Sequence, residues 1–434
     1  MRKLLLASAA TMGALLAATG GAQAQPVTQP APGTIAVHLN GYLQFAIGDY
    51  GSTFNTYTAT GSTATTKLNP VTTNGDARLY AGFDAATLNG INYGAQIELR
   101  TTTSNSGQSS GSNTTNSSGT ESIYVKRAYG YLGTSQAGYV RLGQTDSAFS
   151  LLQSGVVEGF GDGAQFNADG GIINAVPSNT VPGNFVFADQ SKLYATDKIV
   201  YLSPKIANFS MGVGFEPSSN GLKEGTANCA TAATTCSSVS SYSSSTVNYT
   251  ARKNTIDAAL MYAANLHGFL TKASVGVLNA APVNDTYPGV AQVKGMTVYQ
   301  AGAQTTFAGL TVGANVKWGS VEDGYAFIAK GARNGLTYIA NATYVVGPYV
   351  VGASFYDGQT AGAWTSTNGM GRTMSEYGVA VGGNYVIGKD LSLFTQYLYG
   401  HRHQANNNIY ASNGTLSNGN AQVQLIETGA TFKW

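Results

Sequence analysis

Residues 427–434, which read ETGATFKW, decide the fold. Counting back from the end, every second residue (Trp434, Phe432 and Ala430) is apolar, and the residues between them are polar or small. Such alternation is typical of a β-strand, whose successive side chains point to opposite faces. An aromatic residue at the tip of a strand is favourable at a membrane–water interface. The stretch therefore predicts a strand with one face against lipid and the other against water.

The same alternation occurs near the other end of the chain. Residues 35–47 alternate over thirteen positions, and residues 77–84 and 91–100 repeat the pattern with their charges on one face only. A half-buried helix cannot produce a period of two. We expect the charged face to line a wet lumen and the apolar face to contact lipid.

Extended along the chain, this pattern predicts an all-β fold, a sixteen-stranded antiparallel transmembrane β-barrel. Seven short turns and eight long connections join the strands, and such barrels have short turns on the periplasmic side and long loops outside. The expected strands cover 35–47, 77–84, 91–100, 123–132, 138–145, 197–204, 207–216, 247–264, 269–279, 296–307, 310–318, 335–346, 349–358, 375–387, 390–400 and 421–434.

The segment 247–264 is ambiguous because its apolar parity changes between Tyr249 and Ile256. A single strand here requires a β-bulge, which we place near Asn254. Two strands would give the barrel an odd number, whereas bacterial single-chain barrels have even numbers. We therefore expect one bulged strand.

The first 24 residues predict a secretory signal peptide and hence export through the Sec pathway. Arg2 and Lys3 precede a short apolar run, and Ala22-Gln23-Ala24 fits a cleavage site. Residues 25–34 are Pro-rich and read as a periplasmic lead-in, so we expect the barrel to cover 35–434. Without Arg2 and Lys3 the formal net charge falls from +2 to zero, which argues against nucleic acid as a partner.

The composition supports a membrane barrel. Charged residues make up 10% of the chain, against about 25% in soluble domains. The chain has 55 glycines and 26 tyrosines, and no stretch after the signal approaches a transmembrane helix. A secreted β-sandwich or β-helix is the competing interpretation, although a β-helix would show a repeat of fixed length, and we find none.

Two cysteines, Cys229 and Cys236, lie in a Ser/Thr/Ala-rich stretch. In an exported chain an even count favours a disulfide, here a local staple in a loop, and two free thiols are the alternative. No histidine lies near them, so they are poor candidates for zinc. The sequence predicts no metal site and no cofactor.

Several motifs in order resemble general Gram-negative outer-membrane porins of alphaproteobacterial type. The segments 124–132 (YVKRAYGYL) and 138–144 (GYVRLGQ) are similar to the paired strands before the porin constriction loop. The segment 158–162 (EGFGD) resembles the tip of that loop, and 197–204 (DKIVYLSP) resembles the following strand. The end of the chain, with Gly429, Phe432 and Trp434, resembles the membrane-insertion signal of outer-membrane barrels.

The resemblance implies a homotrimer of barrels in outer-membrane lipid, each with one connection, here within 146–196, folded inward to narrow a water-filled channel. By position, Glu158 and Asp162 are the expected acids of this constriction. The expected bases on the opposing wall are Arg78, Lys126 and Lys198, of which Arg78 also has the parity of the lumen face. Where the family often has arginine, this chain has Gln144, which reduces the expected basic cluster.

The strand pattern and the resemblance both predict a channel for passive diffusion of small hydrophilic solutes and ions, without catalysis. A solute-selective channel, for example for sugars, is the first alternative. An adhesin or a barrel enzyme is a further alternative. The segment 107–111 fits the pattern G-x-S-x-G but lies in a Ser/Gly tract and not between a strand and a helix, so chance explains it better than a nucleophile. His401 and His403 are expected to be surface residues.

Overall fold

The computed structural model of the protein describes residues 30–53, 56–58, 65–67, 69–101, 123–166, 193, 196–219, 252–282, 293–322, 325–361, 373–404 and 419–434. None of the helices in these ranges is both long and apolar enough to cross a membrane.

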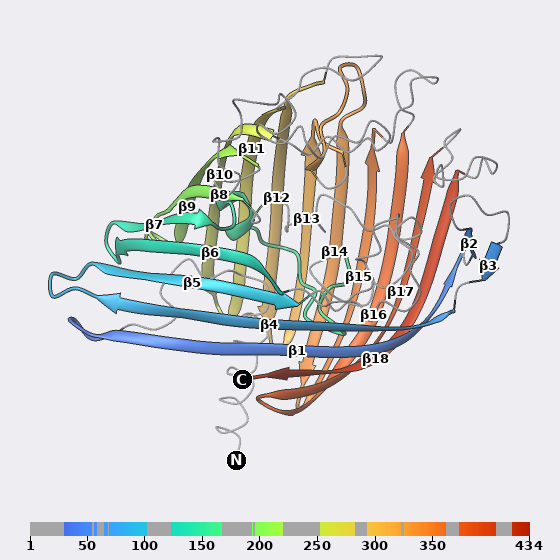
Figure 1. Cartoon of the computed structure of the whole chain (residues 1–434), viewed down its shortest axis with the longest axis horizontal. Coiled ribbons are helices and arrows are strands. Elements are labelled where there is room, and N and C mark those ends of the chain that lie inside the picture. The colour runs from blue at the N-terminus through green and yellow to red at the C-terminus, as the bar shows by residue number, and fades with distance from the viewer. Residues whose placement is uncertain are drawn as a thin grey trace.

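Sixteen strands of the described residues close into one antiparallel barrel, because β1 pairs with both β4 and β18 (Figure 1). A separate two-stranded hairpin, β2 (Thr56–Thr58) and β3 (Thr65–Lys67), lies in the connection between β1 and β4. The barrel strands are β1 (Ile35–Ser52), β4 (Val71–Ala86), β5 (Asn92–Thr101), β6 (Ile123–Thr134), β7 (Gly138–Gln144), β8 (Asp197–Leu202), β9 (Phe209–Ser218), β10 (Arg252–Leu266), β11 (Phe269–Pro282), β12 (Met296–Phe307), β13 (Leu310–Gly319), β14 (Gly335–Val346), β15 (Tyr349–Thr360), β16 (Met374–Gly388), β17 (Leu391–Gln404) and β18 (Asn420–Lys433).

The strand number and the antiparallel closure confirm the sequence prediction. The expected bulge in β10 is present, since its register with β11 shifts between Lys253 and Ile256. Asn254 lies within this shift and has a positive φ of 50°, a conformation that asparagine tolerates better than most residues. The β2–β3 hairpin was not predicted, because three-residue strands are too short to show a period.

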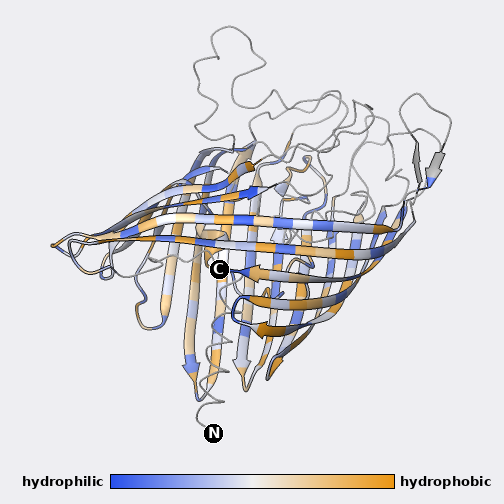
Figure 2. Cartoon of the chain, turned by 60° about the horizontal axis from the view of Figure 1, so that its bottom comes forward, coloured by the Kyte–Doolittle hydropathy of each residue, from blue (hydrophilic) through white to orange (hydrophobic). Residues whose placement is uncertain are grey.

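The two faces of the barrel differ in polarity. Along β1, Leu39 is 62% exposed and Phe45 is 55% exposed on the outside, whereas Gln44 between them is buried inside. Figure 2 shows hydrophobic and hydrophilic residues alternating along the strands. Apolar side chains outside and polar side chains inside are what a lipid exterior and a wet lumen require.

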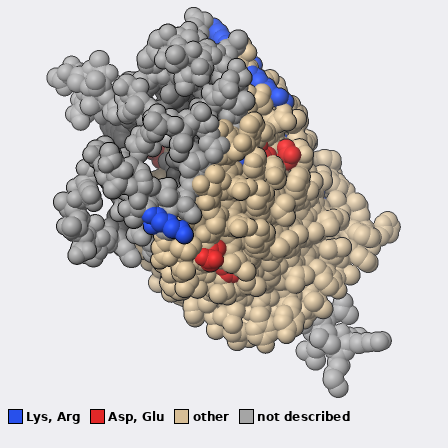
Figure 3. Space-filling view, turned by 90° about the vertical axis from the view of Figure 1, so that its right-hand side faces the viewer, with Lys and Arg blue, Asp and Glu red and all other residues tan. Residues whose placement is uncertain are grey.

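Aromatic residues gather outside at both ends of the barrel. Near the short turns the rings of Phe269 and Phe307 stack with centroids 4.3 Å apart. Near the long connections Tyr299 stacks on Trp318 at 5.6 Å. Such belts mark the two membrane interfaces. Figure 3 shows few charged side chains on the described surface of the face that it presents.

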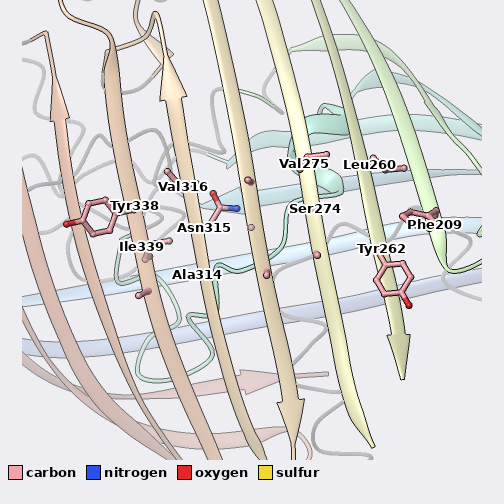
Figure 4. A pocket seen from close by; sticks show the side chains of 15 residues that line it. Phe209, Leu260, Tyr262, Ser274, Val275, Ala314, Asn315, Val316, Tyr338 and Ile339 are labelled. Atoms are coloured by element: carbon pink, nitrogen blue, oxygen red, sulfur yellow. The ribbon is translucent and has the colours of Figure 1, made fainter. Parts of the chain in front are cut away.

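The outward face of β9–β14 carries a shallow apolar hollow (Figure 4). A row of paired alanines forms its floor, and aromatic residues such as Tyr262 and Tyr338 stand at its sides. Small side chains make the wall thin at this level. The alanines are Ala273, Ala303, Ala314 and Ala340.

Candidate functional site

The segment after β7 folds back into the barrel and follows its inner wall (Figure 1). We call its described part, residues 145–166, the inward loop. It begins with a single helical turn, α2 (Ala148–Leu151), for which Ser147 is the N-cap. Phe149, Phe160 and Phe166 are at most 1% exposed, so the loop is packed against the wall. This agrees with the predicted inward connection.

Side chains of the wall bond the first half of the inward loop through its main chain. The Phe149 amide donates to Asp257 Oδ1 at 2.8 Å, and Gln300 Nε2 donates to the Phe149 carbonyl at 2.5 Å. The Ser154 amide donates to Ser274 Oγ at 2.9 Å, and Asn315 Nδ2 donates to the Ser154 carbonyl at 2.7 Å. The strands β10 to β13 therefore hold this half through its main chain, and the Ser154 hydroxyl adds a bond to the Gly302 carbonyl at 2.9 Å.

Asparagine and glutamine side chains continue the same pattern to the other side of the barrel. Asn341 accepts from the Val157 amide at 3.0 Å, and Asn384 both accepts from and donates to the Gly161 main chain at 2.9 Å. Gln396 accepts from the Asp162 amide at 3.4 Å, and Gln44 on β1 donates to the Asp162 carbonyl at 3.1 Å. Paired main-chain groups stabilise an irregular segment that could not otherwise be buried.

Glycines on the inner wall give the inward loop its space. A Cβ on Gly302 would lie 2.0 Å from the Ser154 carbonyl oxygen, and one on Gly313 would lie 2.9 Å from Val157. Further along, a Cβ on Gly352 would lie 2.2 Å from the Phe160 ring. Any larger residue at these positions must displace the loop toward the lumen.

The two predicted acids lie at the tip of the inward loop, where both are bonded by the loop itself. Glu158 Oε1 accepts from the Phe166 amide at 2.7 Å, and Asp162 Oδ1 accepts from the Ala164 amide at 2.9 Å. Glu427 of β18 lies beside Asp162, and its Oε1 accepts a hydrogen bond from Gln396. Glu158 is 9% exposed and Asp162 is 6% exposed.

Arg78, a predicted base, lies on the lumen face of β4. Its guanidinium pairs with Asp76 and lies 4.8 Å from the centre of the Tyr42 ring. Arg78 and Arg100 are direct cross-strand neighbours on β4 and β5. The position of Arg78 follows from strand parity, as the sequence indicated.

A continuous charge network extends from Arg100 to the start of the inward loop. Arg100 pairs with Glu98 at 2.5 Å, and Arg127 bridges Glu98 and Asp146. Arg127 contacts both oxygens of Asp146, at 2.9 and 3.1 Å. Sequence reasoning missed Arg127 and Asp146, although the single charged face of 91–100 indicated Glu98 and Arg100 as lumen residues.

The other two predicted bases lie elsewhere. Lys126 occupies a bulge of β6, because Arg127 pairs with Glu98 and Val125 pairs with the next residue, Leu99. The Gln144 amide donates to the Lys126 carbonyl at 3.2 Å and supports this bulge. The structure thus brings Arg127, the neighbour of Lys126, into the charge network.

Lys198 belongs to a buried ion triad below the outer ends of β8 to β10. Its ammonium lies 3.1 Å from Glu216, and the Arg252 guanidinium lies 2.7 Å from the same carboxylate. All three side chains are at most 2% exposed. The triad joins three strands, and Lys198 is not brought together with Arg78 in this network.

The residues of the C-terminal signal have the expected parity. Phe432 and Trp434 are 43% and 60% exposed, and a Cβ on Gly429 would lie 2.3 Å from the Phe45 carbonyl oxygen and 2.4 Å from the Phe394 ring. Residues 1–24, Cys229 and Cys236 lie outside the described residues. Within the described ranges, no three His, Cys, Asp or Glu side chains form a metal-binding group.

Comparisons with known proteins agree with this architecture. The sequence matches the family model of Gram-negative porins over residues 7–405. A search of the curated proteins found no match. Among solved structures, an anion-selective porin from Comamonas acidovorans matches with a TM-score of 0.53 and 14% identity, covering 92% of this chain and 100% of that chain. A mutant of the Rh. blastica porin matches with a TM-score of 0.49 and 12% identity, at the same coverage of both chains. Because the family model matches most of its length, the chain belongs to the Gram-negative porin family and forms an outer-membrane channel.

Proposed function

We propose that the chain is a passive diffusion channel for small hydrophilic solutes and ions, and that the inward loop sets its narrowest cross-section. The observation that carries this proposal is the bonding of the loop along the inner wall, from Asp257 on β10 to Gln44 on β1. The loop faces the charge network of β4 to β6, and channel selectivity arises from such charged linings and from diameter.

We further propose that three copies associate in the outer membrane after Sec export and removal of residues 1–24. The outward faces of β4 to β6 support close packing of another copy, because small side chains stand on this face around Ile97, which pairs with one of them on each neighbouring strand. These are Ala81, Ala95, Ala128 and Gly130.

Planar-bilayer recording of the purified protein tests the proposal. We expect ohmic single channels, and closures in groups of three equal steps if the protein is a trimer. A pure, folded protein that inserts without any conductance would contradict the channel. Conductance that closes in single steps would contradict the trimer alone.

Neutralising the two loop acids is expected to shift selectivity toward anions. The double variant Glu158→Gln with Asp162→Asn removes negative charge from the tip of the inward loop. Reversal potentials in a salt gradient measure the shift, and Asp390→Asn in an exposed turn is the matched control. An unchanged reversal potential would mean that these acids do not act on the permeating ions.

A sugar-selective channel is a second candidate, favoured by tyrosines that face the lumen on β1, β4 and β6. Tyr42 and Tyr80 lie in successive inward rows, and the Tyr129 hydroxyl donates to Gln96 at 2.5 Å. Rings of this kind stack on sugars while their hydroxyls form hydrogen bonds. Concentration-dependent block of the ion current by an oligosaccharide would favour this candidate over general diffusion.

The family and the fold are those of a channel, and we propose that the protein has no enzymatic activity. His401 stacks on Tyr377 with centroids 5.0 Å apart, and His403 bonds Asn420 at 2.7 Å. These contacts lie on the outer face of β16 to β18 and bring no nucleophile to either histidine. The segment 107–111 lies outside the described residues.

A further inference from the structure

We propose that Lys433, inside the C-terminal insertion signal, is a selectivity-determining residue that draws small inorganic anions along a row of lumen cations. This inference rests on the proposed channel function and names the ion class that the channel prefers. It does not involve the acids of the inward loop.

The parity of β18 directs Lys433 into the lumen. Thr431, two residues earlier, accepts a hydrogen bond from the inward-facing Gln44 at 3.1 Å. Phe432 faces outward and is 43% exposed. Successive side chains of a strand point to opposite faces, so Lys433 shares the lumen face with Thr431. The last residues of the chain therefore face lipid on one side of the strand and the water-filled lumen on the other.

The barrel register places Lys433 in one cross-strand row with two arginines. Lys433 pairs with Tyr42 on β1, Tyr42 pairs with Arg78 on β4, and Arg78 pairs with Arg100 on β5. Lys433 ends β18, whereas Arg100 lies near the far end of β5. Because the strands of a barrel are tilted, this row rises along the wall from the periplasmic rim toward the outer mouth.

The cations of the row differ in their partners. Asp76 pairs with Arg78 and Glu98 pairs with Arg100, so each arginine has a carboxylate on its own strand. In the described part of the chain, no carboxylate forms an ion pair with the Lys433 ammonium. The charge of Arg78 acts on this ammonium. The carboxyl oxygen of Trp434 is engaged by the Gly41 amide at 3.0 Å.

An uncompensated ammonium in a half-buried lumen position attracts passing anions more than paired arginines do. Charge focused between low-dielectric walls raises the local concentration of counter-ions, and charged linings set the sign of selectivity in wide pores. Chloride and inorganic phosphate carry the negative charge that such a row attracts. Lys433 thus gives the row its net positive character.

The test is the reversal potential of single channels in a potassium chloride gradient. Lys433→Gln is expected to lower the chloride-to-potassium permeability ratio about threefold, the scale of one unit charge acting over several ångströms in water. Lys433→Glu should lower it further, and Lys433→Arg should keep the original ratio. Lys389→Gln is the matched control, because Lys389 is 82% exposed in a turn.

Each outcome bears on one claim. An unchanged ratio in conducting Lys433→Gln and Lys433→Glu channels would overturn the inference and leave the channel function intact. Absence of conductance in the unaltered protein would instead overturn the channel. Asp76→Asn leaves the C-terminal signal intact and removes the carboxylate that pairs with Arg78 in the same row. This variant therefore tests whether the row attracts anions even if the Lys433 variants do not assemble. For Asp76→Asn we expect a higher chloride-to-potassium permeability ratio. An unchanged ratio would count against the attraction of anions along this row.

Discussion

Glu216→Gln is expected to destabilise the folded barrel by about 3–5 kcal/mol, which is the cost of removing one partner of a buried ion pair. Glu216 is fully buried and pairs with Lys198 at 3.1 Å and with Arg252 at 2.7 Å. The neutral amide would leave two buried cations side by side without the carboxylate that both of them contact. Uncompensated buried charge is costly because the ions lose their hydration without gaining a partner.

Heat-dependent gel mobility of the purified protein in detergent measures this effect as the temperature at which folded barrels unfold. Lys389→Gln is the control, since its ion pair with Asp390 spans 3.8 Å at an exposed turn and such pairs contribute about 0–1 kcal/mol. The double variant Glu216→Gln with Lys198→Met removes one of the orphaned cations and should recover part of the loss. Equal unfolding temperatures for Glu216→Gln and the control would show that the triad does not stabilise the barrel.

Most of the fold could be predicted from strand parity, that is, from the alternation of side chains between the two faces of each strand. Arg78, Glu98 and Arg100 could be assigned to the lumen because each lies on the polar face of an alternating strand. The bulge near Asn254 could be predicted from a single change of parity, because one extra residue inverts every later side chain. These features are local, and a local period is what a sequence displays directly.

The partners within the lumen could not be predicted in the same way. Lys126 and Arg127 are adjacent, and the bulge that selects Arg127 becomes visible only in the pairing of β5 with β6. Asn341 and Asn384 carry inward parity, yet their bonds to the inward loop span 184 and 223 residues of sequence. Contacts of this kind depend on the closed barrel, so asparagine and glutamine on the lumen face were the only local signal.

Gly302→Val is expected to reduce single-channel conductance at least about twofold by pushing the inward loop into the lumen, since pore diameter limits permeation. The first added carbon would lie 2.0 Å from the Ser154 carbonyl oxygen and 2.3 Å from Asn315 Nδ2. Both atoms belong to the bond that holds the loop to β13, at 2.7 Å. The wall at Gly302 is a paired strand and cannot retreat, so the loop must move.

Paired recordings of Gly302→Val and Gly388→Val separate this effect from a general loss of glycine. Gly388 has open space where its Cβ would stand, and it lies at the end of β16 away from the inward loop. The size limit for neutral solutes, measured by the swelling of protein-loaded liposomes, should fall together with the conductance, because both depend on the same gap. If Gly302→Val assembled normally with unchanged conductance and size limit, the narrowest passage would lie elsewhere. The inward loop would then stabilise the barrel wall without limiting permeation.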